Sequence, residues 1–391
     1  MEVTKSFTNQ AAKQENNLST ETPSTIVCFS HLRWDFVYQR PQHLLSRFAT
    51  MYSVYYVEEP VFDAKGEPTV TFTSKSDKLW VVVPHLPEGT SPEDAILLQK
   101  QLLDKFLRKR KSQDLLFWYY TPMALKFSGH YKAAFTVYDC MDELSHFKFA
   151  PPELTQLEDQ LLERADIVFT GGHCLYEYKK DRHKNIFPVP SSIDKKHFEQ
   201  ARTTKEEPED QKNIQGPKLG FYGVIDERFD IELIGEMAEK RPEWQFVLLG
   251  PVVKIDPATL PRNKNIHYLG GKSYEQLPLY VSGWDVALIP FMLNDATRFI
   301  SPTKTPEYLA AGVPVVSTGI RDVIRPYGEA GIVKIATGAD EFIEAAENYI
   351  QMDRTNWLPE VDEFLKDNSW SNTFMGMHKN IMATIEANNK N

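Results

Sequence analysis

The chain has 391 residues and a mass of 45.0 kDa, enough for two domains at the usual size of roughly 100 to 200 residues each. Hydrophobic residues make up 42% and charged residues 25%, which is typical of a folded soluble protein and excludes a collagen-like or wholly disordered chain. The net charge of -10 repels phosphate backbones, so no nucleic-acid partner is expected.

Apolar runs, the N-terminal segment and the cysteine spacing indicate the cellular compartment in which the protein is expected. No run approaches the roughly 18 consecutive apolar residues of a membrane span, and the polar N-terminus lacks the apolar stretch of a signal peptide. Residues 1–23 are predicted to be a disordered tail, because they are polar and without periodicity. Cys28, Cys140 and Cys174 show no CxxC spacing, which argues against a disulfide framework or a zinc site. A cytoplasmic protein without a cofactor is expected.

The first half of the chain, residues 24–199, has the pattern of a parallel sheet covered on both faces, since short apolar runs alternate with amphipathic, helix-length segments. Ser91, followed by Pro92 and two acids, predicts a helix that begins there and runs to about Lys111. The predicted strands are Ile26–Phe29, Val54–Val57, Leu79–Val83, Leu115–Tyr119, Thr136–Tyr138, Ile167–Thr170 and Ile186–Val189.

A charged stretch, residues 200–217, predicts an exposed linker to a second α/β domain at 218–352. Residues 353–391 then carry scattered aromatic residues and a final helix near Met375–Ala387, and two crossings between the domains would form a hinge. The second domain is predicted to contain a helix at Ile231–Lys240 and strands at Leu219–Tyr222, Phe246–Leu249, His267–Leu269, Val286–Ile289, Val313–Val316 and Ile332–Lys334.

Spacing excludes several familiar sites. The first strand is not followed by G-x-G-x-x-G, which disfavours a dehydrogenase. Gly271-Lys272-Ser273 resembles the end of a P-loop, but the required earlier glycine is Ile266. Neither D-x-D nor H-E-x-x-H occurs, so no metal dependence is expected.

The most informative stretch is Pro290–Thr318, in which a proline-rich loop leads into a short helix that ends at Gly312. A helix N-terminus offers free N–H groups and partial positive charge to a diphosphate, and Lys304 adds a full charge at that turn. Glu307 can accept two hydrogen bonds from a ribose diol. These features alone also fit a capped surface helix with an ordinary Lys/Glu pair.

The run from Glu307 to Val316, EYLAAGVPVV, resembles the donor-binding segment of the retaining glycosyltransferases with the GT-B fold, family 4 or "glycosyl transferases group 1". The preceding Ser301, Pro302 and Lys304 match the S-P-x-K-x-x-E-Y-L-A-x-G subset of that family. The stretches KLGFYGVIDERFDIELI, ERADIVFTGG and FPVPSSIDKKHF extend the resemblance over the chain after the tail, and HLRWDFVYQRPQHLLSRFA with VYDCMDE resembles bacterial transferases of cell-surface polysaccharide synthesis, including the teichuronic acid type.

The resemblance implies two Rossmann-like α/β domains facing a cleft, with a C-terminal helix crossing back to the first. It implies donor-binding roles for Gly223, Arg228, Ser301, Thr303, Lys304, Thr305 and Glu307. Two positions depart from the family pattern. Phe299 replaces the first Glu of E-x7-E, which leaves Asp295 as the nearby carboxylate, and Val224 replaces an Arg, which leaves Arg228 as the nearby cation.

Polar residues also follow strands of the first domain, where ligands bind in open α/β sheets. Arg40, Asp139 and Asp142 are the candidate catalytic residues. In the alternative, the two acids cap the next helix and Arg40 pairs with a surface acid. The acceptor-side candidates are His31, Trp34, Asp35 and Gln39.

The helix 93–111 combines an apolar side with many Lys and Arg residues. Such a helix can lie on the inner face of the cell membrane, whereas a core-facing helix with C-terminal cations is the alternative.

The predicted function is metal-independent, retaining transfer of a sugar from a UDP- or GDP-sugar to a saccharide or lipid-linked acceptor. An epimerase with the same fold and a partner subunit that binds nucleotide sugar without turnover are the alternatives.

Overall fold

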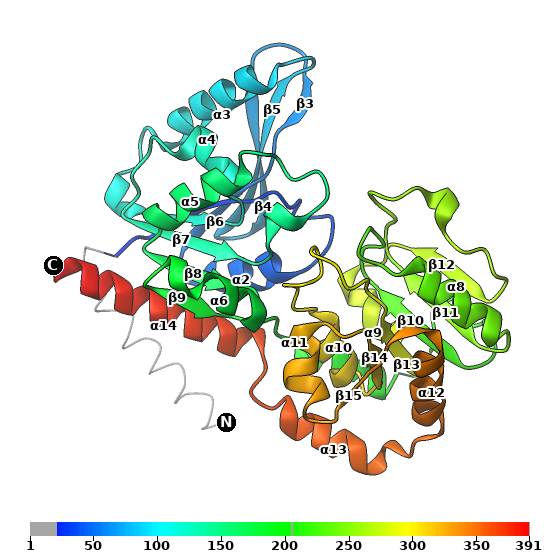
Figure 1. The fold of residues 1–391 in the computed structure, drawn as a ribbon. Coiled ribbons are helices and arrows are strands. Elements are labelled where there is room, and N and C mark those ends of the chain that lie inside the picture. Colours follow the sequence, from blue (N-terminus) through cyan, green and yellow to red (C-terminus); the bar gives the residue numbers. More distant parts are fainter. Residues whose placement is uncertain (1–21, 205, 391) are drawn as a thin grey trace.

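The computed structural model describes residues 22–204 and 206–390, so the predicted tail lies almost wholly outside the described residues. Two sheets, each flanked by helices, form two lobes (Figure 1). The first sheet has the strand order β3-β5-β2-β1-β6-β7-β8-β9, with β4 pairing antiparallel to β5, and the second has the parallel order β12-β11-β10-β13-β14-β15. This is the predicted arrangement of two doubly wound α/β domains.

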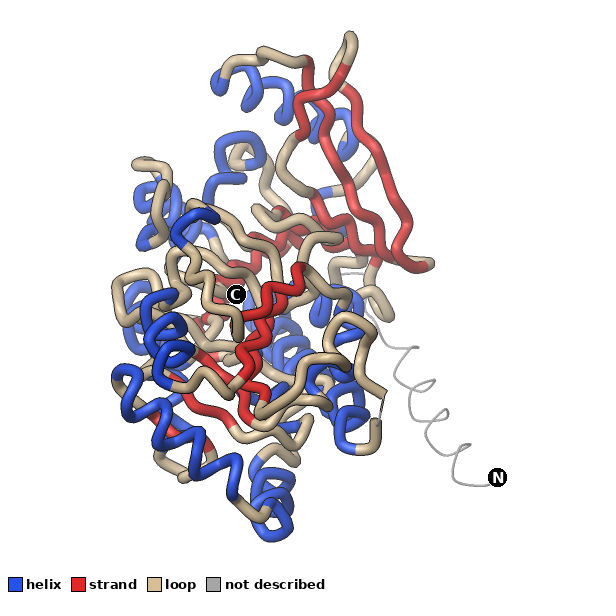
Figure 2. Tube along the Cα trace, turned by 90° about the vertical axis from the view of Figure 1, so that its right-hand side faces the viewer, coloured by secondary structure: helices blue, strands red, loops and turns tan. Residues whose placement is uncertain are grey.

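The strands of the first domain are β1 (Thr25–Phe29), β2 (Ser53–Val57), β3 (Val61–Ala64), β4 (Thr69–Ser76), β5 (Leu79–Pro87), β6 (Leu115–Tyr119), β7 (Phe135–Cys140), β8 (Ile167–Thr170) and β9 (Ile186–Pro188). Its helices are α2 (Arg40–Phe48), α3 (Pro92–Leu107), α4 (Leu125–Ser128), α5 (Leu154–Arg164), α6 (His173–Lys179) and α7 (Lys195–Glu199). The sequence analysis missed β3 and β4, which extend as a projecting sheet away from the second domain (Figure 2). Most of β4 is exposed, so it lacks the buried alternation that marks a strand.

The second domain contains the strands β10 (Lys218–Tyr222), β11 (Gln245–Leu249), β12 (Ile266–Gly270), β13 (Val286–Ile289), β14 (Val315–Ser317) and β15 (Val333–Ile335). Its helices are α8 (Ile231–Lys240), α9 (Leu277–Val281), α10 (Lys304–Ala310), α11 (Arg321–Val323) and α12 (Gly338–Gln351), followed by α13 (Arg354–Phe364) and α14 (Trp370–Asn389). The prediction for α8 is confirmed residue for residue. In contrast, α14 begins five residues earlier than predicted because Ser369 caps it, its side chain accepting a hydrogen bond from the Asn372 N–H.

The last helix returns to the first domain. Trp370, Met377, Ile381 and Ile385 of α14 are buried in one cluster with residues of β1, β2 and α2. In Figure 1 this helix lies beneath the first domain, whereas α13 lies against the second. The predicted crossing of the C-terminal helix is therefore confirmed.

The segment expected to be an exposed linker instead packs on the second domain. Gln211 is fully buried, donates to the Tyr280 carbonyl and accepts from the Trp284 indole at 3.0 Å. Lys272 reaches back to Asp210 at 2.6 Å. The segment is mostly exposed, as its charge indicates, but the charge did not reveal the contacts of Asp210 and Gln211 with the second domain.

Candidate functional site

A cavity of about 670 Å³ opens between the two domains. One wall is the loop 34–39 of the first domain, and the other is built from the ends of β10 and β11, the loop after β12 and the start of α10. The carboxyl ends of the parallel strands point into this cleft, which is where open α/β sheets bind ligands. The predicted donor residues Gly223, Arg228, Thr303, Lys304 and Glu307 all line it.

Glycines allow the backbone to approach the cleft closely. Gly223, just after β10, has φ +136°, and a Cβ there would lie 2.3 Å from Cε of Lys304. Gly250, just after β11, has φ +142°, and its Cβ would lie 1.8 Å from the Gly223 carbonyl oxygen. Any larger residue would push these loops apart, so the pair of glycines is what places Lys304 against the end of β10.

Lys304 is the first residue of α10, and its Nζ lies over the rings of Phe221 and Phe291 at 5.6 and 5.7 Å from the centroids. Burial lowers the pKa of Lys304, and the charge of Arg228 lowers it further. An anion bound beside these two cations would relieve the repulsion between them. The cleft is thus electrostatically prepared for a phosphate group.

Arg228 is held by its own loop. Its Nε and Nη2 donate to the two carboxylate oxygens of Asp226 at 2.9 and 2.8 Å. Its guanidinium also lies 5.5 Å from the ring centre of Phe147, which belongs to the first domain. Arg228 therefore keeps a fixed position where the two domains meet.

Glu307 lies one turn into α10 and is only 5% exposed. Its Oε2 accepts a hydrogen bond from the Tyr222 hydroxyl, and burial raises the pKa of this carboxyl against the opposing effects of Tyr222 and Lys304. Residues Thr305–Ala310 are all buried, which excludes the alternative of a capped surface helix. A buried carboxylate at a cavity wall, held on one oxygen, is suited to accept hydrogen bonds from a diol.

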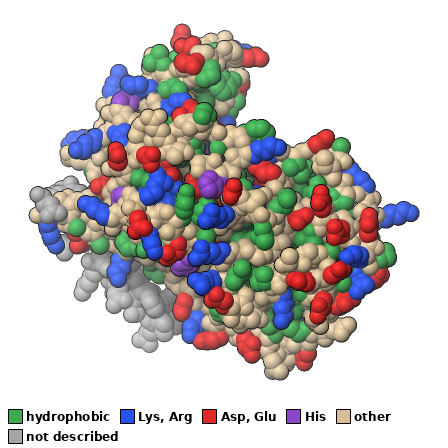
Figure 3. Space-filling model, viewed as in Figure 1, with side chains coloured by type: hydrophobic (Ala, Val, Ile, Leu, Met, Phe, Trp, Pro, Cys, Tyr) green, Lys and Arg blue, Asp and Glu red, His purple; other side chains and the backbone are tan. Residues whose placement is uncertain are grey.

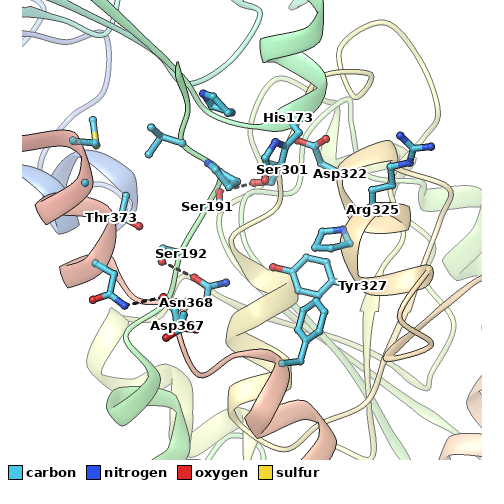
Figure 4. A pocket seen from close by; sticks show the side chains of 18 of the residues that line it. His173, Ser191, Ser192, Ser301, Asp322, Arg325, Tyr327, Asp367, Asn368 and Thr373 are labelled. Atoms are coloured by element: carbon cyan, nitrogen blue, oxygen red, sulfur yellow. Dashed lines mark hydrogen bonds between the residues drawn. The ribbon is translucent and has the colours of Figure 1, made fainter. Parts of the chain in front are cut away.

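Two of the predicted donor residues lie elsewhere. Thr305 is fully buried, and its hydroxyl has no hydrogen-bond partner among the described residues. Ser301 lines a different cavity of about 500 Å³ (Figure 4). There the Ser191 hydroxyl donates to the Ser301 carbonyl at 2.6 Å and so ties this loop to the first domain. Thr305 faces the core because it falls on the inner side of the first turn of α10.

The predicted catalytic residues separate into two groups. Asp139 has no exposed surface, and both of its carboxylate oxygens accept hydrogen bonds from Arg40 at 2.7–3.2 Å. Arg40 is 4% exposed and also donates to the Val189 carbonyl at 2.7 Å. The catalytic role of Asp139 stays a prediction. The alternative in which Arg40 pairs with a surface acid is wrong, because its partner is the buried Asp139.

Asp142 is half-buried and does not belong to the residues that line the cleft cavity. Burial raises its pKa to about 6, although Arg228, Arg40 and Lys304 all lower it. Two of these cations, Arg228 and Lys304, belong to the second domain, so Asp142 lies near enough to that domain to feel their charge. A carboxyl that titrates near neutral pH in such a place is suited to proton transfer or to stabilising positive charge on a sugar ring.

Of the acceptor-side candidates, Trp34, Asp35 and Gln39 line the cavity and His31 does not. Burial and the nearby charge of Lys254 lower the pKa of His31 to about 4, so it is neutral at pH 7. Asp35 is bound to Lys75 at 2.7 Å, and Gln39 forms a capping box with Gln42 at the start of α2. Gln39 thus has a structural function in addition to its place in the wall.

Phe299 and Asp295 do not face the donor groups. Phe299 is 3% exposed, and its ring lies 4.6 Å from that of Tyr178 on α6 of the first domain. Asp295 is exposed and outside the cavity lining. The structure therefore does not support Asp295 as a replacement for the missing Glu of the motif. The side chain at position 299 instead forms a contact between the two domains.

The sequence analysis overlooked an aromatic stack that joins the domains. Tyr274, in the loop after β12, is stacked between Tyr38 at 4.6 Å and His197 at 4.3 Å. His43 meets Tyr274 edge-on at 5.3 Å and stacks on Trp370 of α14 at 4.7 Å. No spacing in the sequence signals these contacts, because the rings come from four distant segments.

Two further findings concern metals and membranes. Within residues 22–204 and 206–390, no group of three or more His, Cys, Asp or Glu side chains is placed to hold a metal ion. Over the same described ranges, no helix has the length and apolar character needed to cross a membrane. Helix α3 packs Ala95, Leu103 and Leu107 into the protein and leaves Leu97 51% exposed.

The chain is similar in sequence and in fold to several known proteins. Residues 217–352 match the family described as "Glycosyl transferases group 1". The Bacillus subtilis (strain 168) protein TuaH, whose name assigns it to teichuronic acid biosynthesis as a glycosyltransferase, is 25% identical over 224 residues. This match covers 52% of the present chain and 55% of TuaH, so the chain spans about half the length of that relative.

Solved structures resemble the whole described chain. Sucrose-phosphate synthase from Thermosynechococcus elongatus gives a TM-score of 0.67 with 14% identity, covering 93% of this chain and all of the other. The E. coli trehalose-6-phosphate protein bound with UDP-2-fluoro glucose gives 0.68 with 12% identity, covering 92% and 99%. The catalytic domain of starch synthase IV from Arabidopsis thaliana, bound to ADP and acarbose, gives 0.62 with 10% identity, covering 93% and 100%. These similarities show a shared GT-B fold.

Proposed function

We propose, on the premise that the chain is a GT-B glycosyltransferase of group 1, that it transfers a sugar from a nucleotide diphosphate sugar to an acceptor bound by the first domain. One observation carries this proposal. Lys304 and Arg228 lie at a glycine turn beside the buried Glu307, in a cleft that the first domain closes from the other side.

The donor is placed by the chemistry of these groups. The diphosphate lies against Lys304 and Arg228, and Glu307 accepts hydrogen bonds from the ribose. As the bond to the sugar breaks, negative charge grows on the diphosphate, and the fixed cations stabilise it there. Transfer on this route is independent of a divalent metal.

The sugar itself then lies toward Asp142, the first-domain carboxyl whose pKa is influenced by Arg228 and Lys304. We propose that the configuration at the anomeric carbon is retained and that Asp142 stabilises positive charge on the sugar ring. Arg40 and Asp139 contribute indirectly, because their buried ion pair holds the strand end from which the loop of Asp142 starts.

The biological setting follows from similarity and is part of the proposal. TuaH is named for teichuronic acid biosynthesis, and two of the similar structures are named with UDP-2-fluoro glucose and with ADP. We propose a UDP- or GDP-sugar as donor, a saccharide or lipid-linked saccharide as acceptor, and surface polysaccharide synthesis as the process.

Binding of UDP and GDP, measured by isothermal titration, tests the donor site. Lys304→Met should weaken binding at least tenfold, since a hydrogen bond to a charged group is worth about 1.5–3 kcal/mol. Lys240→Met is the matched control, because Lys240 lies in the same domain and pairs only with the exposed Asp340. Equal affinity of both variants for the nucleotide would refute the proposed site.

Product analysis then separates transfer from the two alternatives. A transferase releases nucleoside diphosphate and extends an acceptor, whereas an epimerase converts the nucleotide sugar without acceptor. A subunit that only binds does neither.

A further inference from the structure

The segment 298–301, which leads into α10, is held by both domains at once. Phe299 and Ile300 are adjacent in the chain, and they are only 3% and 6% exposed. Phe299 packs in the core of the first domain, and among the described residues it is the one buried member of that core that the second domain supplies. Ile300 packs in the core of the second domain. Two neighbouring side chains thus enter opposite cores, which fixes this short segment between the domains.

The Phe299 ring contacts two rings of the first domain. Its centroid lies 4.6 Å from that of Tyr178 on α6 and 5.5 Å from that of His146. Rings at such separations attract one another in addition to the apolar area that they bury. In the space-filling view the two domains meet in a continuous surface below the projecting sheet of the first domain (Figure 3). Since Phe299 is almost fully buried, its ring lies inside this interface and not at the rim.

Backbone atoms on both sides of this ring are also bound by the first domain. The Cys174 thiol donates to the Arg298 carbonyl at 3.3 Å, and the Ser191 hydroxyl donates to the Ser301 carbonyl at 2.6 Å (Figure 4). A Cβ on Gly172 would lie 2.9 Å from Cβ of Ser301, so the glycine permits the close approach of the two segments. The segment is therefore bound before and after the ring.

A contact from α11 of the second domain supports the same place. Asp322 is 6% exposed, and its Oδ1 accepts a hydrogen bond from the Cys174 N–H at 2.9 Å. Gly172, at the N-cap position of α6, has no side chain to accept this bond, so a carboxylate of the other domain caps the helix. The thiol and the N–H of Cys174 thus bind two different segments of the second domain.

This anchored segment lies next to the cation of the proposed donor site. Lys304 begins α10 five residues after Phe299, and Pro302 between them restricts the backbone. Among the described residues the Lys304 ammonium has no hydrogen-bond or ion-pair partner and lies over two aromatic rings, so its position depends on the backbone that carries it. Glu307, one turn further into α10, is held separately by the Tyr222 hydroxyl.

We propose that Phe299 is a positioning residue, which holds the start of α10 against the first domain and so places Lys304 for the donor diphosphate. This inference rests on the proposed function, because it takes Lys304 as the cation of the donor site. Where the family motif has a carboxylate, this chain has a ring that joins the domains. Nucleotide binding in the second domain therefore depends on contact with the first domain.

Nucleotide binding, measured by isothermal titration with UDP and GDP, tests this dependence. Phe299→Ala should weaken binding about fivefold or more, although Phe299 does not line the cleft cavity, because Lys304 is no longer held in place. Phe299→Leu keeps an apolar side chain in the first core and should restore most of the affinity. In the background of Lys304→Met, Phe299→Ala should weaken binding by less than about twofold, since both changes remove the same contact.

A change in the first domain gives a second test and leaves the second domain intact. Tyr178→Ala removes a ring that contacts Phe299, and the fold should tolerate the change because Tyr178 is 49% exposed. It should weaken nucleotide binding about threefold or more, through the contact between the domains. Phe72→Ala is the matched control, since Phe72 is 48% exposed and its ring contacts Tyr55 and Phe106 of the same domain.

The outcomes separate this inference from the function on which it rests. The inference is overturned if Tyr178→Ala and Phe72→Ala bind the nucleotides equally well, or if Phe299→Ala causes the same loss with and without Lys304. If Phe299→Ala does not fold, the comparison of the Tyr178 and Phe72 variants decides alone. Affinity that depends on Lys304 but not on Tyr178 or Phe299 rejects only this inference, whereas a wild-type protein that binds neither UDP nor GDP rejects the proposed function as well.

Discussion

The buried ion pair between Arg40 and Asp139 allows a test of whether Asp139 stabilises the fold or takes part in catalysis. Both side chains are almost completely buried, and three hydrogen bonds of 2.7–3.2 Å join them. At a separation of roughly 4 Å between charge centres and an effective dielectric constant of about 20, the attraction is about 4 kcal/mol. Removing one partner leaves the other charge buried and unpaired, which costs about 3–5 kcal/mol.

We therefore expect Asp139→Asn to lower the free energy of unfolding by about 3–5 kcal/mol, measured by urea denaturation with tryptophan fluorescence. The double variant Arg40→Met with Asp139→Leu should lose less than the sum of the two single changes, because it leaves no unpaired charge. Asp35→Asn is the control, since Asp35 is 73% exposed and should change stability by no more than about 0.5 kcal/mol.

Nucleotide affinity per folded molecule should be normal in Asp139→Asn, because the donor groups belong to the second domain. The reasoning is refuted if Asp139→Asn unfolds at the wild-type urea concentration and yet abolishes transfer. That result would return Asp139 to the reacting groups.

Three further predictions concern the cleft. Glu307→Gln should weaken donor binding, measured by titration, by about 1–3 kcal/mol and leave the melting temperature unchanged. If the variant instead fails to fold but its folded fraction binds the donor normally, Glu307 serves stability and not donor binding. Burial and the charge of Arg228 lower the pKa of Lys304, so nucleotide affinity should decrease with rising pH at a lower pH than it would for an ordinary lysine. Lys304→Arg should move this decrease to higher pH, because arginine keeps its charge. Identical pH profiles of the two proteins would contradict the prediction. Transfer should continue in excess chelator, and complete loss restored by a divalent metal would exclude the metal-independent route.

The sequence alone was enough to predict the architecture, because a parallel strand that is buried on both faces appears in the sequence as a short run of apolar residues. β10 and β11 are examples in which almost every residue is buried, and both were predicted within one residue. The sequence also predicted that Lys304 and Glu307 belong to one site, and both line the cleft cavity, because the turn that starts α10 and the glycine that follows it lie within a dozen residues of them.

Side-chain partners that come from distant segments were decided only by the tertiary structure. Arg40 and Asp139 are 99 residues apart, and nothing local shows that each neutralises the other. In the sequence, Phe299 only shows that the chain departs from the family motif. In the structure, its ring contacts Tyr178 of the other domain. Periodicity reports which face of an element is buried, whereas the identity of the buried neighbour depends on how the two domains and α14 pack together.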